Sequence, residues 1–395
     1  MLLLCVYAAF NAAQNKICMR VLLIGGTGLL STEILKCLLG QGHELSIINR
    51  GRSSSPFQDM IKIYKADINK TKNVQNLLKS IEFDVVVDFV SYTVAELKNV
   101  LNIFALKCDQ FIFISTACVY RRNNKDGIIR EDSPLINPNW IYSKNKADCE
   151  KFLITRASEL GLNYTIVRPY ITYGNKRLPF GILPDNGYHW TYISRILNDK
   201  PVFLWDDGKA ICTLTHVADF AKGVVGLIGN KCAYNEEFNV TGDETYTWEE
   251  VLLMIGKQLG KELFIEKIPS VFIVDNLPEL KGILIGDRCL DAIFDNSKIK
   301  KTIPSLSFGM TLENGIDEVL ESYKKNNFYK GIDYVWDAKI DRLICNYQKK
   351  NNKSYNCNMR YIDYLNDKSV YNHLIYYMNR HYSNRFVSKI SQILK

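Results

Sequence analysis

The chain has 395 residues, of which 47% are hydrophobic and 23% are charged, and it carries a formal net charge of +8. These values are ordinary for a soluble globular protein, and the length allows a large core in one two-lobed unit. The eleven cysteines form no Cys-x-x-Cys pair, and the five histidines do not cluster with them. The sequence therefore argues against a metal site and favours reduced thiols in a cytoplasmic protein.

The first 18 residues, MLLLCVYAAFNAAQNKIC, precede the first convincing strand. Their apolar run from Leu2 to Phe10 is too short to span a bilayer. Their only charged side chain is Lys16, so the basic start of a secretory signal is missing. We expect residues 1–18 to be an extension outside the core, and we expect no transmembrane segment.

Strands and helices alternate over the first half of the chain. Strands are predicted at 20–24, 44–48, about 60–65, 84–90, 110–115 and 163–169. Helices are predicted through about Leu39, near 71–81, through about Lys107 and around Tyr142. This alternation predicts an α/β fold with a doubly wound, Rossmann-like parallel sheet over residues 19–175.

From Tyr173 the pattern becomes irregular, with helices near 215–228 and 247–259. We expect residues 176–347 to form a smaller substrate-binding lobe, interleaved with the first domain. Residues 348–395 form a basic tail rich in Tyr and Asn, with nine Lys and Arg against two Asp, so it holds most of the net charge. A helical stripe of Val370, Leu374 and Met378 predicts a helix that docks on the core or serves as a binding appendage.

A glycine turn, GGTGLLS from Gly25 to Ser31, follows the first strand. Closely spaced glycines let backbone N–H groups approach a pyrophosphate at a helix N-terminus. The candidate dinucleotide contacts are Gly25, Gly26, Thr27, Gly28, Leu29 and Leu30. Ser31 stands where a third glycine is usual, and it is small enough to keep helix and strand close. An ordinary strand–helix turn is the alternative.

The end of the second strand bears on the choice between NAD and NADP. An acidic residue here suits the ribose hydroxyls of NAD, whereas an arginine suits the 2′-phosphate of NADP. The sequence has Arg50 and no carboxylate between Ile47 and Ser55, which favours NADP unless the arginine is merely solvated. Asp67 and Ile68 are expected beside the adenine, and Val90 beside the nicotinamide ribose.

Tyr142 and Lys146 lie four residues apart on one predicted helix and so share a face. A neighbouring ammonium group favours the phenolate, which makes Tyr142 a candidate acid/base. Ser115 and Thr116 end another apolar strand. With the glycine turn, these residues predict a cofactor site beside a hydroxyl, phenol and ammonium catalytic set.

Several motifs occur together and in one order: GGTGLLS, Asp67-Ile68, FISTACVY, Tyr142-x-x-x-Lys146, RPYITYG, THVADFAKG and FDNSKIKK. Over residues 19–347 the chain resembles the short-chain dehydrogenase/reductase superfamily, in its extended epimerase/dehydratase branch. The resemblance implies Tyr142 as acid/base, Lys146 on the nicotinamide ribose, and Thr116 with Ser115 at the reacting oxygen. The glycine variant looks more like the atypical members, which include plant chloroplast RNA-binding relatives.

The resemblance also implies an enzyme acting on a hydroxyl or keto carbon of a sugar nucleotide, with NADP or NAD, and a homodimer as the usual assembly. Sugar 4,6-dehydratases carry Asp-Glu directly after the catalytic Thr, whereas this chain has Ala117 and Cys118, which disfavours dehydration. An epimerase usually retains NAD, whereas Arg50 points to exchangeable NADP and net reduction. The sequence therefore leaves two alternatives for the reaction, epimerisation and net reduction.

Other polar residues are weaker candidates for substrate contacts. Arg168 could close the cleft or end its strand, and Tyr188, Trp190 and Arg195 could hold a nucleotide or pack in the core. His216 and Asp219 open a predicted helix, where this spacing is more often a structural cap.

The alternative function is RNA binding by a Rossmann scaffold through the basic, Tyr-rich tail. The catalytic set at Thr116, Tyr142 and Lys146 favours the enzyme, because a pure binder has no use for it. The positive charge of the tail favours RNA binding, although a cluster of charged residues usually just faces the solvent.

Overall fold

The computed structural model describes residues 18–52, 55–122, 127–135, 137–184, 187–327, 331–353, 370–382, 386–387 and 389. The first lobe is built on a seven-stranded sheet in which every neighbouring pair is parallel. Its spatial order is β11 (Glu236–Val240), β6 (Asn163–Pro169), β5 (Cys108–Ile114), β4 (Phe83–Asp88), β1 (Arg20–Ile24), β2 (Glu44–Asn49) and β3 (Lys62–Lys65).

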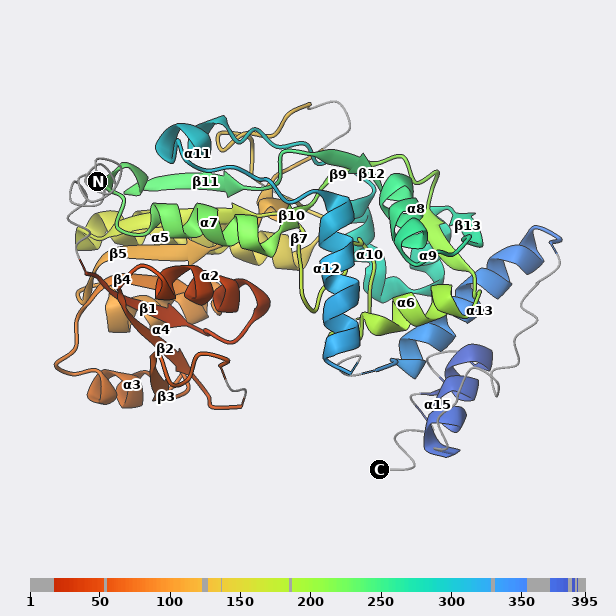
Figure 1. Cartoon of the computed structure of the whole chain (residues 1–395), viewed down its shortest axis with the longest axis horizontal. Coiled ribbons are helices and arrows are strands. Elements are labelled where there is room, and N and C mark those ends of the chain that lie inside the picture. Colours follow the sequence, from red (N-terminus) through yellow and green to blue (C-terminus); the bar gives the residue numbers. More distant parts are fainter. Residues whose placement is uncertain are drawn as a thin grey trace, which may run out of the picture.

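Both faces of this sheet are covered by helices (Figure 1). Successive strand residues point to opposite faces, so Val21 and Leu23 join one core while Leu22 and Ile24 join the other. The first core includes α2 (Leu29–Leu39), α7 (Val217–Leu227) and α11 (Ser297–Thr302). The second includes α3 (Thr71–Leu77), α4 (Val94–Phe104) and α5 (Ile141–Leu160). The predicted doubly wound parallel sheet is confirmed.

The strand order reverses beside β1, because β2 and β4 flank it on opposite sides. Ligands in open α/β sheets bind outside the carboxyl ends of the strands at such a point. The glycine turn after β1 and the segment after β4 therefore lie where a cofactor is expected.

The second lobe is smaller and holds short strands in pairs. These are β7 (Thr172–Tyr173) with β10 (Thr215–His216), β8 (Val202–Trp205) with β13 (Ile265–Ile268), and β9 (Ile211–Thr213) with β12 (Thr245–Thr247). Its helices are α6 (Trp190–Leu197), α8 (Trp248–Gln258), α9 (Ser270–Asn276), α10 (Lys281–Ile283), α12 (Leu312–Lys325) and α13 (Tyr334–Lys350). Single turns are η1 (Ala117–Val119), η3 (Lys231–Ala233), η4 (Pro278–Leu280) and the π-helical η5 (Leu284–Arg288). Between β10 and β12 the chain returns to the first lobe as α7 and β11, so the two lobes are interleaved.

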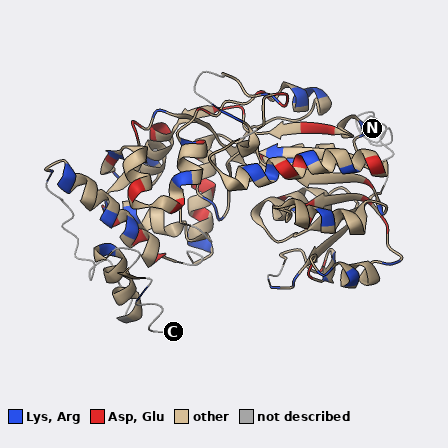
Figure 2. Cartoon of the chain, turned by 180° about the vertical axis from the view of Figure 1, so that it is seen from behind, with Lys and Arg blue, Asp and Glu red and all other residues tan. Residues whose placement is uncertain are grey.

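The C-terminal helices depart from the sequence prediction. Helix α13 runs through the expected boundary at residues 347 and 348, and α15 (Val370–His381) lies beside it (Figure 1). On α15, Leu374 of the predicted stripe is 50% exposed, whereas Tyr376 is 1% exposed and lies on the buried face. Figure 2 shows basic residues on these helices. Residues 1–17 and 354–369 lie outside the described part.

No helix in the described ranges combines the length and hydrophobicity that a bilayer crossing requires.

Candidate active site

The turn after β1 has the geometry that a phosphate-binding loop needs. Gly25 and Gly26 have φ of +114° and +65°, and a Cβ on Gly26 would lie 2.5 Å from Cγ2 of Ile47. Only glycine fits such a position without strain. Gly28 begins α2, and its N–H donates to Ser31 Oγ at 3.1 Å. Ser31 therefore fixes the turn through this hydrogen bond, and its small side chain also lets α2 pack closely against the sheet.

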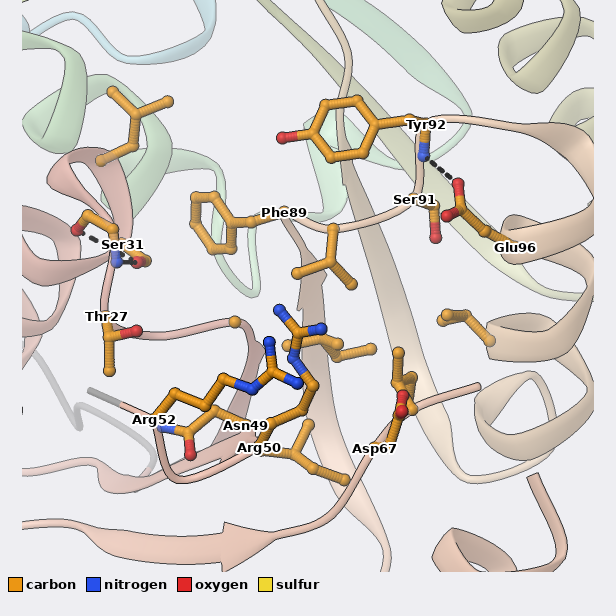
Figure 3. Close-up of a pocket in the computed structure, with 18 of the residues that line it drawn as sticks. Thr27, Ser31, Asn49, Arg50, Arg52, Asp67, Phe89, Ser91, Tyr92 and Glu96 are labelled. Atoms are coloured by element: carbon orange, nitrogen blue, oxygen red, sulfur yellow. Dashed lines mark hydrogen bonds between the residues drawn. The ribbon is translucent and has the colours of Figure 1, made fainter. Parts of the chain in front are cut away.

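A cavity of about 660 Å³ opens over the carboxyl ends of β1 to β4 (Figure 3). Nine of the predicted cofactor residues line it, namely Gly25, Thr27, Gly28, Leu29, Leu30, Arg50, Asp67, Ile68 and Val90. Gly26 does not line the cavity and lies against Ile47 instead. The cavity reaches from the helix N-terminus to the end of β4, so its extent and its donors fit a dinucleotide.

Two arginines enter this cavity from the end of β2. Arg50 and Arg52 both line it, and Figure 3 shows their guanidinium groups close together. Asn49 accepts a hydrogen bond from the N–H of Gly51 at 2.8 Å, and Gly51 has φ of +71°. This turn brings Arg52 back beside Arg50. Sequence reasoning had put only Arg50 forward.

A second cavity of about 390 Å³ adjoins the first and contains all four predicted catalytic residues, Ser115, Thr116, Tyr142 and Lys146. The two cavities share five lining residues, which are Leu30, Phe89, Tyr92, Thr172 and Arg177. They therefore form one cleft, with the cofactor site leading into the catalytic set.

Lys146 is 2% exposed and spans the ends of two strands. Its Nζ donates to the carbonyl oxygens of Ser91 and Ile114, both at 2.8 Å, and lies 4.7 Å from the centre of the Tyr92 ring. Burial lowers its pKa, while Asp88 acts in the opposite direction. The ammonium group is thus held firmly between β4 and β5.

Tyr142 stands between two other rings, with ring-centre distances of 5.0 Å to Trp140 and 6.2 Å to Tyr92. Burial raises its pKa, and Cys118 and Tyr92 raise it further. Thr116 and Arg177 act in the opposite direction. The expected depression of the Tyr142 pKa is therefore wrong for the protein alone, because desolvation of the phenolate outweighs the nearby positive charge.

Ser115 and Arg168 belong to a buried network that anchors α5. The hydroxyl of Ser115 donates a short hydrogen bond to Glu150, two turns after Tyr142. Arg168 donates to Glu150 at 2.7 Å and to the Tyr120 hydroxyl at 2.7 Å. Of the two roles considered for Arg168, the structure favours the one at the end of its strand, because its charge is paired inside the core and it does not line the catalytic cavity.

The other three substrate candidates lie away from the cleft, and neither cavity is lined by them. Arg195 is fully buried and forms ion pairs with Asp337 at 2.5 Å and Asp341 at 2.9 Å. Trp190 packs on Tyr323 with ring centres 5.7 Å apart, and Tyr188 is half-buried before α6. His216 caps α7 by accepting from the N–H of Ala218, so it has the structural role expected.

Sequence reasoning missed several residues that line the catalytic cavity, among them Tyr92, Trp140, Arg177 and Arg288. Tyr92 follows β4 by four residues, so the end of that strand was a usable signal. Arg288 comes from η5, far along the chain, and no local pattern connects it with Tyr142. The π-helical form of η5 is a geometry often found at functional sites.

Comparison with known proteins identifies the family and similar folds. A family model described as the NAD dependent epimerase/dehydratase family matches residues 21–241. The chain is 26% identical over 254 residues to the chloroplast stem-loop binding protein of 41 kDa b of Arabidopsis thaliana, covering 61% of this chain and 63% of that protein. It is also 26% identical over 175 residues to the UDP-glucose 4-epimerase of Lactobacillus helveticus, covering 40% and 52% respectively.

The fold resembles that of UDP-glucuronic acid 4-epimerase from Bacillus cereus, solved in complex with NAD. The TM-score is 0.63 at 21% identity, over 79% of this chain and 98% of that one. The chain spans less than two thirds of the length of both curated relatives. Because the family model matches more than half of the chain, this protein belongs to the NAD-dependent epimerase/dehydratase family.

Proposed function

We propose that this protein is an oxidoreductase or epimerase that uses a nicotinamide dinucleotide and acts on a hydroxyl or keto carbon of a sugar nucleotide. The observation that carries this proposal is the single cleft in which the dinucleotide cavity opens onto Thr116, Tyr142 and Lys146. The UDP-glucose 4-epimerase relative supports the substrate class.

In the proposed reaction Tyr142 exchanges a proton with the reacting hydroxyl. The phenolate oxygen takes the proton from the substrate, and the hydroxyl of Thr116 hydrogen-bonds the same substrate oxygen. A bound nicotinamide ring supplies the hydride acceptor or donor. Lys146 is held by the carbonyl oxygens of Ser91 and Ile114, and its remaining N–H would bind the ribose of the cofactor. The protein contributes positions and charges.

The lining of the catalytic cavity bears on the kind of reaction. It contains Cys118 where a dehydratase carries a carboxylate, and no Asp or Glu is among the described residues that line it. Burial raises the pKa of the Cys118 thiol, so this group is a poor base. We therefore favour epimerisation or reduction over 4,6-dehydration.

The test is turnover with a panel of UDP- and dTDP-sugars, following the near-ultraviolet absorbance of reduced nicotinamide and the sugar products. Tyr142→Phe should lower turnover by roughly 10²-fold or more, because it removes the proton carrier alone. Tyr234→Phe, distant from the cleft, is the control. Near-normal turnover of Tyr142→Phe on a true substrate contradicts the assignment.

RNA binding is the second candidate, favoured by the relative named as a stem-loop binding protein and by the basic tail. A full-length variant in which Lys349, Lys350, Lys368 and Lys389 are replaced by Gln tests it, because it removes charge from the tail and keeps α15, which packs on α13. If the tail binds RNA, this variant should lose salt-sensitive affinity for a stem-loop RNA while its catalysis is unchanged. Equal affinity of both chains rules the tail out as the contact.

A further inference from the structure

Arg177 sits at the point where the two cavities join, and it lines both of them. It is exposed to the cleft, and no carboxylate in the described part of the chain is paired with its guanidinium group. The buried arginines Arg168 and Arg195, by contrast, are each held by a carboxylate. Arg177 thus presents a positive charge to the cleft itself.

The backbone that carries Arg177 is tightly fixed. The N–H of Gly174 donates to the carbonyl of Arg177 at 3.1 Å, and the N–H of Arg177 donates back at 2.9 Å. Gly174 has φ of +137°, and a Cβ there would lie 2.7 Å from Cγ1 of Val217. Asn175, with φ of +44°, completes the turn. A turn of this kind sets the starting point and direction of the Arg177 side chain.

The lysine of the catalytic set is occupied by other groups. Two carbonyl oxygens accept from Lys146 Nζ, and the Tyr92 and Phe113 rings lie within 5 Å of it. Burial, in contrast, disfavours the charged phenolate form of Tyr142, whereas the positive charge of Arg177 favours that form. The phenolate needs positive charge close by, and Arg177 is placed on the wall of the same cavity.

We propose that Arg177 acts through Tyr142 as a positioning residue, a second cation that stabilises the Tyr142 phenolate from across the cleft. This inference rests on the proposed acid/base role of Tyr142. When the substrate O–H bond breaks, the proton forms the O–H bond of Tyr142, and Arg177 neither gains nor loses a proton. Its charge makes the phenolate form available at lower pH.

Other groups also face Tyr142 and define its titration. Tyr92 and Cys118 raise its pKa from the segments after β4 and β5, and Thr116 lowers it. The charged residues in the same cavity, besides Arg177, are Lys146 on α5 and Arg288 on η5. Arg288 is ion-paired with the buried Asp287, a carboxylate that it shares with Arg122, so Arg288 is a further cation in this cavity.

The test replaces Tyr142 by 3,5-difluorotyrosine, whose phenol ionises at lower pH, and follows its fluorine-19 NMR signal in a pH titration. In the full chain, Arg177→Met should raise the ionisation midpoint by about one to two pH units, as expected for the loss of one charge from the wall of the same cavity. Arg177→Lys should keep most of the original midpoint. Lys176→Met, an exposed neighbour that lines neither cavity, should leave it unchanged.

An unchanged midpoint in Arg177→Met, or an equal shift in Lys176→Met, overturns the proposal. Loss of NADP affinity in Arg177→Met without a midpoint shift also overturns it, because the arginine then serves the cofactor. The titration needs no substrate. A failure of the proposed reaction, seen as normal turnover in Tyr142→Phe, is therefore distinguishable from a failure of this inference.

Discussion

At the scale of single residues, Arg50 and Arg52 give the cofactor cavity its distinctive charge. Both side chains enter it from the end of β2, where an acidic residue would suit NAD. Two guanidinium groups side by side offer several donors to a phosphate. The pair therefore extends the argument for NADP from one arginine to two.

Arg50→Ala should raise the dissociation constant for NADP roughly tenfold to a hundredfold, because it removes charge-assisted hydrogen bonds to the 2′-phosphate. The affinity for NAD should stay nearly constant. Isothermal titration calorimetry of the variant with each dinucleotide checks this, with Arg156→Ala on the exposed face of α5 as control. A parallel loss of NAD and NADP affinity contradicts the expected preference.

The buried hydrogen-bond network around Glu150 also depends on single residues. Glu150 is fully buried and holds Arg168, so Glu150→Gln leaves a buried guanidinium without its countercharge. We expect a loss of about 3 kcal/mol or more in the free energy of unfolding. Glu159→Gln changes the same residue type on the same helix, but its pair with Arg156 is exposed, so the loss there should be below about 1 kcal/mol.

Urea denaturation of both variants provides the measurement. Similar stability of the two proteins would show that the buried pair contributes little to anchoring α5.

At the scale of elements, a buried ionic cluster joins α13 and α15 to α6 and the segment that follows α6. Arg195 and Lys200 pair with both Asp337 and Asp341 of α13, and the Tyr376 hydroxyl of α15 donates a short hydrogen bond to Asp341. Residues from three helices thus depend on one another. The tail was expected either to dock on the core or to serve as an appendage, and its helix α15 packs against α13.

This cluster predicts a loss of stability in acid. Burial alone would raise the pKa of Asp341, but Arg195 and Lys200 outweigh it and hold the pKa below its usual range. A carboxyl with a depressed folded-state pKa contributes stability above its unfolded value near pH 4, and that stability is lost as the pH falls further. Asp341→Asn should lower stability at neutral pH and flatten its decline in acid.

Unfolding free energies from about pH 6 down to pH 3 test this, with the exposed Asp317→Asn as control. An acid decline that is equally steep in Asp341→Asn and in the unmodified protein would assign the effect to other carboxyls.

The strands also show which elements sequence patterns can predict and which they miss. Six strands of the sheet were predicted, because apolar runs such as VLLI and VVV are buried on both faces. The seventh, β11, was missed: it begins with two glutamates and stands at the sheet edge, so its pattern is weak. The glycine turn and the Tyr142–Lys146 pair were found because their chemistry depends on local spacing.

At the scale of the whole molecule, the missed features are those that join distant parts of the chain. Arg168 and Arg195 were expected at the substrate, yet their carboxylate partners are Glu150 and Asp337, 18 and 142 residues away in sequence. Arg177 and Arg288 line one cavity although they come from separate segments. Local patterns carry no information about such pairings, so the sequence alone could not tell a buried ion pair from a ligand contact.

The central claim is that the two cavities form one site for a nicotinamide dinucleotide, with Tyr142 at its reactive end. Calorimetric titration of the full chain with NADP and NAD tests this most directly, alongside Tyr142→Phe and Lys146→Met. We expect one NADP per chain, weaker binding of NAD, unchanged affinity in Tyr142→Phe and reduced affinity in Lys146→Met, because the proposed role of the Lys146 ammonium group is to bind the cofactor ribose. Absence of binding by either dinucleotide would contradict the account.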